Sequence, residues 1–225
     1  VLARDLHSGG RIGEREAFGR VEGDAQRWVR KGAAIDEALL RIVDSIIVGG
    51  GMAFTFLKAQ GHSVGDSLLE EDMVDTCARL LASGATIYLP EDVTALGGGG
   101  KLFDPAAGGE IRQSGVDLPP GWMGVDIGPG TAAVFGDVIE QAGTVLWNGP
   151  MGVFEFPRFA EGTFGVAKSV ADSGATSIVG GGDSVAAINS AGLADRITHI
   201  STGGGASLEM LEGLMELVIK FQFYD

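Results

Sequence analysis

Short apolar runs alternate with longer stretches of helical periodicity along most of the chain. The apolar runs cover residues 43–48, 86–89, 122–127, 144–147, 176–179 and 196–200. Continuous runs of this kind are typical of parallel strands, which are buried on both faces. The stretches between them predict helices at residues 36–41, 52–60, 67–82, 131–142, 158–173, 184–191 and 206–214. The alternation predicts an α/β fold, a Rossmann-like parallel sheet of about six strands with helices on both faces in three αβα layers.

The stretch at residues 67–82 has a clear amphipathic pattern. Ser67 followed three residues later by Glu70 resembles a capping box, which predicts the start of this helix. Cys77 lies within the helical pattern, and we expect it to be a core thiol rather than a nucleophile.

A glycine-rich stretch at residues 96–115 interrupts the alternation, and we expect it to be a surface excursion. It contains four glycines followed by Lys101, but it does not match a phosphate-binding P-loop. The first glycine of that motif would fall at Ala95, and Leu102 stands where the motif needs Ser or Thr.

Three of the expected strands end in triple glycines, at residues 49–51, 180–182 and 203–205. A helix is expected after each, so free backbone N–H groups and the positive end of a helix dipole can meet an anion there. Glycine lets the backbone approach a phosphate closely, because no Cβ intrudes. Since the carboxyl ends of parallel strands share one edge of a sheet, the sequence predicts one ligand site at that edge.

Acidic residues dominate the composition, and the formal net charge is −14. Residues 1–32 hold seven basic and five acidic residues, a net charge of +2, which leaves −16 for the rest of the chain. Such an acidic body argues against a nucleic-acid partner. Any phosphate site must therefore rely on local N–H groups, a lysine or a metal ion.

Features of the sequence also bear on the cellular compartment. The single cysteine allows no internal disulfide, and the N-terminus has no apolar signal core. No apolar run reaches the ~18 residues that a membrane helix needs. We therefore expect a cytoplasmic protein without a membrane partner.

Five motifs, taken in order, resemble those of one enzyme family. They are VDSIIVGGGMAFTF at residues 43–56, GWMGVDIGP at 121–129, WNGPMGVFE at 147–155, IVGGGDS at 178–184 and HISTGGGASLE at 199–209. Over residues 38–213 the chain closely resembles the C-terminal, nucleotide-binding domain of phosphoglycerate kinase. The resemblance implies that residues 36–225 form this domain, with residues 1–35 as a divergent lead-in and with divergence again at residues 214–225.

The resemblance implies nucleotide-binding roles for residues on several motifs. Gly50 and Gly51, with Gly124 across the cleft, would line the adenine slot. Asn148 and Glu155 would lie at the ribose and nearby nucleotide groups. From the residues alone, Asn148 also reads as a turn residue and Glu155 as a solvated carboxylate.

The remaining glycine motifs would serve the phosphates and the chemistry. The resemblance places the nucleotide phosphates and their Mg²⁺ at Gly181, Gly182, Asp183 and Ser184. Asp183 would be the metal ligand, since a carboxylate among phosphate-binding glycines suits an intervening Mg²⁺; as a residue type it also suits a helix N-cap. Gly182, Gly204 and Gly205 would act catalytically, by stabilising charge on the transferring phosphoryl group.

The chain departs from the family pattern where the family carries positive charge. Two family lysines that bind nucleotide phosphates correspond here to Trp28 and Gly32, and the lysine usual after Pro129 is Gly130. Basic residues adjacent to the first two positions are Arg27, Arg30 and Lys31. In the family a basic N-terminal domain binds 3-phosphoglycerate, and we expect that partner only if such a domain is supplied.

Two functional hypotheses follow. The first is a partial or strongly divergent phosphoglycerate kinase that binds Mg-ADP or Mg-ATP for phosphoryl transfer but is inactive as this chain alone. We expect it to be monomeric. The second is a non-catalytic adenine-nucleotide-binding module or subunit. An NAD-dependent dehydrogenase is disfavoured, because no G-x-G-x-x-G motif follows the first expected strand.

Overall fold

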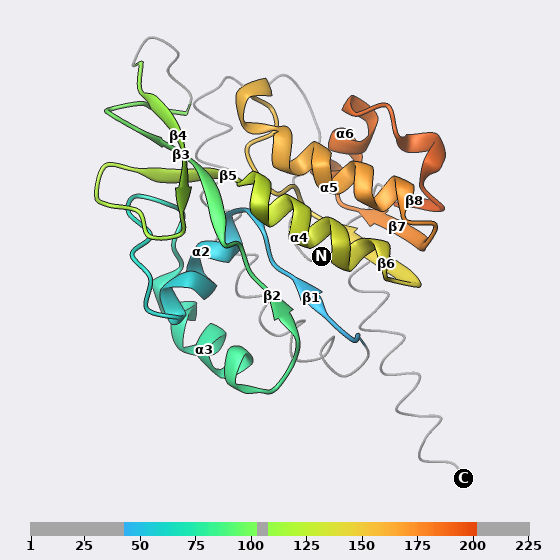
Figure 1. Ribbon diagram of the computed structural model, residues 1–225, viewed down its shortest axis with the longest axis horizontal. Coiled ribbons are helices and arrows are strands. Elements are labelled where there is room, and N and C mark those ends of the chain that lie inside the picture. Colours follow the sequence, from blue (N-terminus) through green and yellow to red (C-terminus); the bar gives the residue numbers. More distant parts are fainter. Residues whose placement is uncertain (1–42, 103–107, 202–225) are drawn as a thin grey trace.

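The strands of the computed structural model lie in three small sheets (Figure 1); the structure describes residues 43–102 and 108–201. In the first sheet, β1 (Ile46–Ile47) pairs in parallel with β2 (Ile87–Tyr88). In the second, β3 (Asp92–Gly97) lies between β4 (Glu110–Gly115) and β5 (Met123–Ile127) and is antiparallel to both. The third is parallel, with β7 (Thr176–Gly180) between β6 (Thr144–Asn148) and β8 (His199–Ser201).

Five α-helices accompany these strands in the described part of the chain. They are α2 (Gly50–Ala59), α3 (Val74–Ala82), α4 (Pro129–Glu140), α5 (Glu161–Asp172) and α6 (Gly182–Ser190). Short 3₁₀ turns occur at Glu71–Met73, Pro157–Phe159 and Ala194–Arg196. The α/β class predicted from the sequence is confirmed. The helices expected at residues 36–41 and 206–214 lie outside the described residues.

The prediction of one parallel sheet of about six strands is wrong for the described residues. Glycines at 98 and 99, with φ of +60° and +79°, allow the chain to leave β3 and return as β4. The stretch at residues 96–115 therefore contributes to a sheet and is not merely a surface excursion. β5 was expected in the parallel sheet, but it pairs with β3 in an antiparallel sheet. In addition, β1 and β6 belong to separate sheets.

Two apolar clusters hold the helices to the parallel strands. The larger one joins α4, α5 and α6 to β6 and β7 around fully buried side chains: Phe135, Trp147, Val166, Val179 and Ile188. A smaller one packs α2 and α3 against β1, and it includes Cys77, which is 2% exposed as expected of a core thiol. Figure 1 shows α4 and α5 side by side, and the two helices are in contact. No helix in the described ranges has the length and apolar character needed to span a bilayer.

The helix start predicted at Ser67 is wrong. α3 begins at Val74, after the 3₁₀ turn Glu71–Met73. The Ser67 hydroxyl instead accepts a hydrogen bond of 2.9 Å from the backbone N–H of Gly124 in β5. A partner distant in sequence thus replaces the local cap that the spacing of Ser67 and Glu70 predicted.

Asp92, at the start of β3, caps the N-terminus of α4. Its carboxylate accepts hydrogen bonds from the N–H of Gly130, at 3.0 Å, and from the N–H and hydroxyl of Thr131, at 2.7 and 2.6 Å. Partial burial would raise the pKa of Asp92, but the hydrogen bonds from Thr131 and Gly130 prevail and lower it below its ordinary value. The folded state therefore favours the ionised carboxylate.

Asp126, in β5, has the corresponding place at the N-terminus of α5. Its carboxyl group accepts hydrogen bonds from the N–H of Gly162, at 2.7 Å, and of Ile127, at 3.0 Å. Desolvation raises the pKa of Asp126 to about 7 despite these two bonds, and the negative charge of Glu161 adds to the rise. The folded state therefore favours the protonated carboxyl group here.

The wild-type protein should lose stability as the pH rises because Asp126 must give up its proton, and Asp126→Asn should not show this loss. Between the ordinary pKa of 3.8 and the folded-state pKa of about 7, the folded protein retains a proton that the unfolded chain releases. Stability attributable to this group thus falls with rising pH, by at most about 1.4 kcal/mol per pH unit. Urea unfolding at pH 5, 6, 7 and 8 measures it: the wild-type curve should fall relative to that of Asp126→Asn. Parallel pH dependences for the two proteins would contradict the prediction.

The opposite pH dependence is expected for Asp92→Asn. Because the folded-state pKa of Asp92 is lowered, its contribution is present above the ordinary value of 3.8 and is lost as the pH falls further. At pH 7 the substitution should cost about 0.3–1 kcal/mol, the usual contribution of a negative charge at a helix N-terminus, because Asn keeps an acceptor oxygen but loses the charge. Urea unfolding at pH 7 and at acid pH should show this cost shrinking at the lower pH. An equal cost at both pH values would rule out a charged cap.

Candidate functional site

The turn between β1 and α2 is held against the loop that follows β6. A Cβ on Gly49 would collide with the sulfur of Met151. Gly50 has a φ of +63°, and a Cβ there would lie 2.8 Å from the carbonyl oxygen of Pro150. Position 50 thus requires glycine, whereas a side chain at position 49 would force Met151 to move. The structure brings two of the sequence motifs into contact.

Gly51 and Gly124 lie next to the segment that carries Ser67. A Cβ on Gly51 would lie 2.9 Å from Cδ1 of Leu68, and a Cβ on Gly124 would collide with the ring of Phe54 in α2. The hydrogen bond from Gly124 N–H to Ser67 fixes this arrangement. The glycines predicted for the adenine slot are therefore joined through α2 and residues 67–68.

Leu68 is a candidate site residue that sequence reasoning missed. Its side chain is 41% exposed, one of few large apolar side chains so exposed in the described part of the protein. An exposed apolar side chain beside Gly51 suits contact with a flat apolar ring. The sequence analysis predicted one amphipathic helix over residues 67–82, and an apolar residue in such a pattern ordinarily packs against the core.

The N-terminus of α6 forms the second part of the candidate site. Gly181, with φ +89° and ψ +138°, precedes the helix in a conformation that side chains rarely adopt. Asp183 lies in the first turn of α6. Ser184 is fully buried, and its hydroxyl accepts a hydrogen bond of 2.5 Å from the N–H of Gly149. This bond joins α6 to the same loop that contacts the β1–α2 turn.

Asn148 lies between these two parts of the site. It ends β6, pairs in register with Gly180 of β7 and is 1% exposed. Neither its amide nitrogen nor its amide oxygen has a hydrogen-bond partner among the described residues. An unsatisfied buried amide is costly, so this one is suited to a polar group that enters the site.

The other predicted site residues are less closely connected. Glu155 is exposed, and its side chain makes no hydrogen bond or ion pair with the described residues. Gly204 and Gly205 lie outside the described residues, so their predicted catalytic role stays a prediction.

The residues present fit a magnesium ion that arrives with a nucleotide. In the described ranges no three His, Cys, Asp or Glu side chains cluster as a metal cage. Mg²⁺ is commonly held by one or two carboxylates together with substrate phosphates, and it does not need such a cage. Asp183 beside the Gly181 turn supplies one carboxylate next to a helix N-terminus, where phosphate oxygens are favoured.

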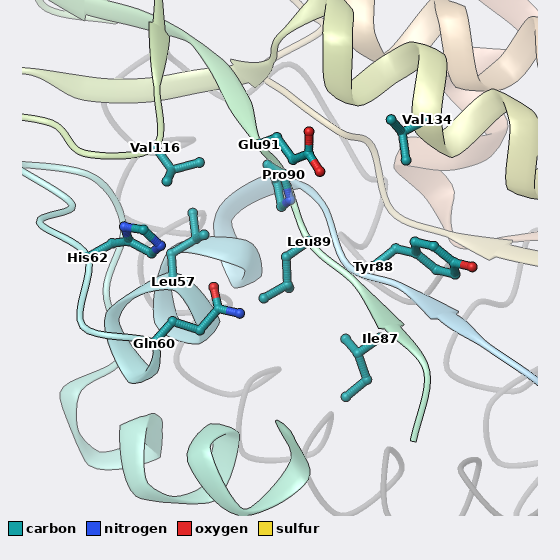
Figure 2. Close-up of a pocket in the computed structure, with 10 residues that line it drawn as sticks. All are labelled: Leu57, Gln60, His62, Ile87, Tyr88, Leu89, Pro90, Glu91, Val116 and Val134. Atoms are coloured by element: carbon teal, nitrogen blue, oxygen red, sulfur yellow. The ribbon is translucent and has the colours of Figure 1, made fainter. Parts of the chain in front are cut away.

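A cavity of about 410 Å³ lies elsewhere, next to β2 (Figure 2). Side chains from α2, β2 and α4 line it, among them Leu57, Tyr88 and Val134. None of the residues predicted for the nucleotide belongs to this lining. The cavity is therefore separate from the candidate site.

Comparison with known proteins agrees with the motifs. The family model for phosphoglycerate kinase matches residues 29–214. The chain is 51% identical over 179 residues to a phosphoglycerate kinase of Clostridium novyi, covering 78% of this chain and 44% of the relative. It is 49% identical over 227 residues to a phosphoglycerate kinase of Salinispora arenicola, covering 95% of this chain and 55% of the relative.

The fold agrees as well. The solved structure of phosphoglycerate kinase from Coxiella burnetii superposes with a TM-score of 0.75 at 40% sequence identity, covering 82% of this chain and 48% of that one. The chain thus spans about half the length of the relatives that it matches. On the strength of the family model, these identities and the shared fold, the chain belongs to the phosphoglycerate kinase family.

Proposed function

We propose that this chain supplies the Mg-nucleotide half of phosphoglycerate kinase. The reaction is the reversible transfer of a phosphoryl group between 1,3-bisphosphoglycerate with ADP and 3-phosphoglycerate with ATP, a step of glycolysis. In this proposal the chain corresponds to the C-terminal domain, acts in the cytoplasm and binds adenine nucleotide as a monomer. It needs a complementary basic domain for 3-phosphoglycerate.

The observation that carries the proposal is the convergence of separate motifs on one loop. Residues 148–152 contact the turn before α2 through Pro150 and Met151. The same loop bonds to Ser184 of α6 through the N–H of Gly149. The glycine turn that we assign to adenine and the helix N-terminus that we assign to phosphate are thus connected by one short segment.

The residues would divide the work as follows. The backbone N–H groups at the start of α6 would donate to phosphate oxygens, aided by the helix dipole. Asp183 would hold the Mg²⁺ that accompanies the nucleotide, and this ion would offset charge on the phosphates. The amide of Asn148 would satisfy its hydrogen-bonding capacity with a polar group of the nucleotide. Fixed donors aimed at the transferring group supply most of what phosphoryl transfer asks of a protein.

Weak nucleotide binding is expected of this chain alone. Trp28 and Gly32 stand where the family carries phosphate-binding lysines, and each such cation contributes about 1.5–3 kcal/mol. Two losses of this size change micromolar binding to near-millimolar binding. The same observation favours the second candidate function, a nucleotide-binding module or subunit that performs no catalysis.

Asp183→Asn should weaken Mg-ADP binding more than it weakens binding of metal-free ADP. The substitution removes the carboxylate charge that would hold the metal but keeps the size of the side chain. Amide chemical-shift titrations with ADP, in Mg²⁺ and in EDTA, measure both affinities in the millimolar range. Asp195→Asn, at an exposed position after α6, is the matched control and should change neither affinity. Equal losses with and without Mg²⁺ in Asp183→Asn would remove the metal role.

The chain alone should transfer no phosphate, whereas a fusion to the N-terminal part of a relative should do so. Orientation of two substrates contributes about 7–11 kcal/mol of barrier reduction, and the described site holds only one of them. A coupled assay with 3-phosphoglycerate, ATP and Mg²⁺ compares the chain, the fusion to the N-terminal half of the Clostridium novyi protein, and that intact protein. Turnover by the chain within tenfold of the intact kinase would contradict the first part. A fusion that binds ADP but stays inactive would favour the non-catalytic module.

A further inference from the structure

Thr163, in the first turn of α5, makes contacts that the proposed function does not use. Its side chain is fully buried. Its hydroxyl oxygen accepts two hydrogen bonds of 3.1 Å, one from the N–H of Met151 and one from the N–H of Gly152. Both donors belong to the loop after β6, so one side chain of α5 holds two consecutive peptide groups of that loop.

The use of this hydroxyl is unusual for a helical threonine. A Thr side chain in a helix commonly bonds to a carbonyl oxygen of the preceding turn. Here its oxygen serves another segment. The end of α5 that carries Thr163 is itself fixed by the hydrogen bond from Gly162 N–H to Asp126 of β5. Thr163 therefore acts from a rigid support.

The loop that Thr163 holds is in contact with both parts of the candidate site. Met151, whose N–H bonds to Thr163, packs its side chain against Gly49 in the turn before α2. Asn148 lies at the other end of the same loop, and the Gly149 carbonyl accepts a hydrogen bond of 2.6 Å from the Trp147 indole. Displacement of Met151 and Gly152 would therefore shift the surfaces that meet the nucleotide.

We propose that Thr163 is a positioning residue for the nucleotide site, which it sets by fixing the backbone of Met151 and Gly152. The inference rests on the proposed function for the identity of the ligand. Thr163 is not one of the residues assigned to the nucleotide, and its hydroxyl oxygen already accepts two N–H groups of the loop. Its effect on binding is exerted through the loop, so the hydroxyl oxygen is the part that matters.

Three variants of the full 225-residue chain test this proposal. Thr163→Val keeps the shape but removes the acceptor, and Thr163→Ser restores it. Val170→Ala, further along α5 at a position 2% exposed, is a control that lowers stability without removing a hydrogen bond to the loop. Mg-ADP affinities are measured by amide chemical-shift titration, with urea unfolding of each variant alongside. Amide hydrogen exchange of residues 148–152 reports on the loop without nucleotide.

Thr163→Val should bind Mg-ADP at least about fivefold more weakly than wild type, an effect in the range of one hydrogen bond. Thr163→Ser should bind within about twofold of wild type, and so should Val170→Ala at comparable loss of stability. Exchange at Met151 and Gly152 should accelerate in Thr163→Val alone. Equal loss of affinity in Thr163→Val and Val170→Ala, or unchanged exchange in the loop, would overturn the proposal. A wild-type chain that shows no shift with Mg-ADP would instead overturn the proposed function, and this inference with it.

Discussion

The loop after β6 is buried, and its backbone polar groups must therefore find partners inside the protein. Side chains from β6, α5 and α6 meet this requirement. The indole of Trp147 and the hydroxyl of Ser184 serve Gly149, and Thr163 serves the next two N–H groups. Each of these partners also fixes the element that carries it. The need to satisfy the backbone polar groups of this loop thus places α5 and α6 around β6, and it also places the candidate site.

Asp92 and Asp126 show how exposure to solvent decides the pKa of a carboxyl group at a helix N-terminus. Each carboxyl group extends from a strand to the N-terminus of a later helix and accepts backbone N–H bonds there. Asp92 remains partly solvated, so the hydrogen bonds dominate and its pKa falls. Asp126 is 4% exposed, so desolvation dominates and its pKa rises to about 7. The helix dipole favours a negative charge at the N-terminus of α4 and at that of α5. At Asp126 this effect does not outweigh the desolvation of the carboxylate.

Local patterns in the sequence predicted most strands and helices to within a few residues, since apolar runs and glycine stops are local signals. The sheet arrangement depends on pairing between distant segments, which such patterns do not encode. The polar residues of β4 gave no alternation, and the pairing of β3 with both β4 and β5 was therefore missed. Ser67 failed as a predicted cap for the same reason, because its partner Gly124 lies 57 residues away.

In the candidate site, too, local sequence features could be predicted and features that depend on distant contacts could not. The glycine turns at residues 49–51 and 180–182 were predicted from the sequence, and Gly50 and Gly181 adopt positive φ values that other residues rarely adopt. Leu68 and Thr163 were not predicted, because an apolar residue and a threonine in helical patterns ordinarily signal packing alone. Burial and hydrogen-bond partners give these residues a different meaning, and only the folded chain supplies that information.

The amide of Asn148 connects the architecture to the proposed ligand. The Asn148 side chain is 1% exposed, and its two polar atoms have no hydrogen-bond partner among the described residues. Burying such an amide destabilises the folded protein. The neighbouring Gly149, by contrast, has partners for both backbone groups: its N–H donates to the Ser184 hydroxyl, and its carbonyl oxygen accepts from the Trp147 indole. The two unpartnered atoms of Asn148 therefore belong to a residue that pairs with Gly180, just before the N-terminus of α6. A nucleotide phosphate or ribose at that helix end would meet both the helix N–H groups and this amide, which would offset the cost of burying it.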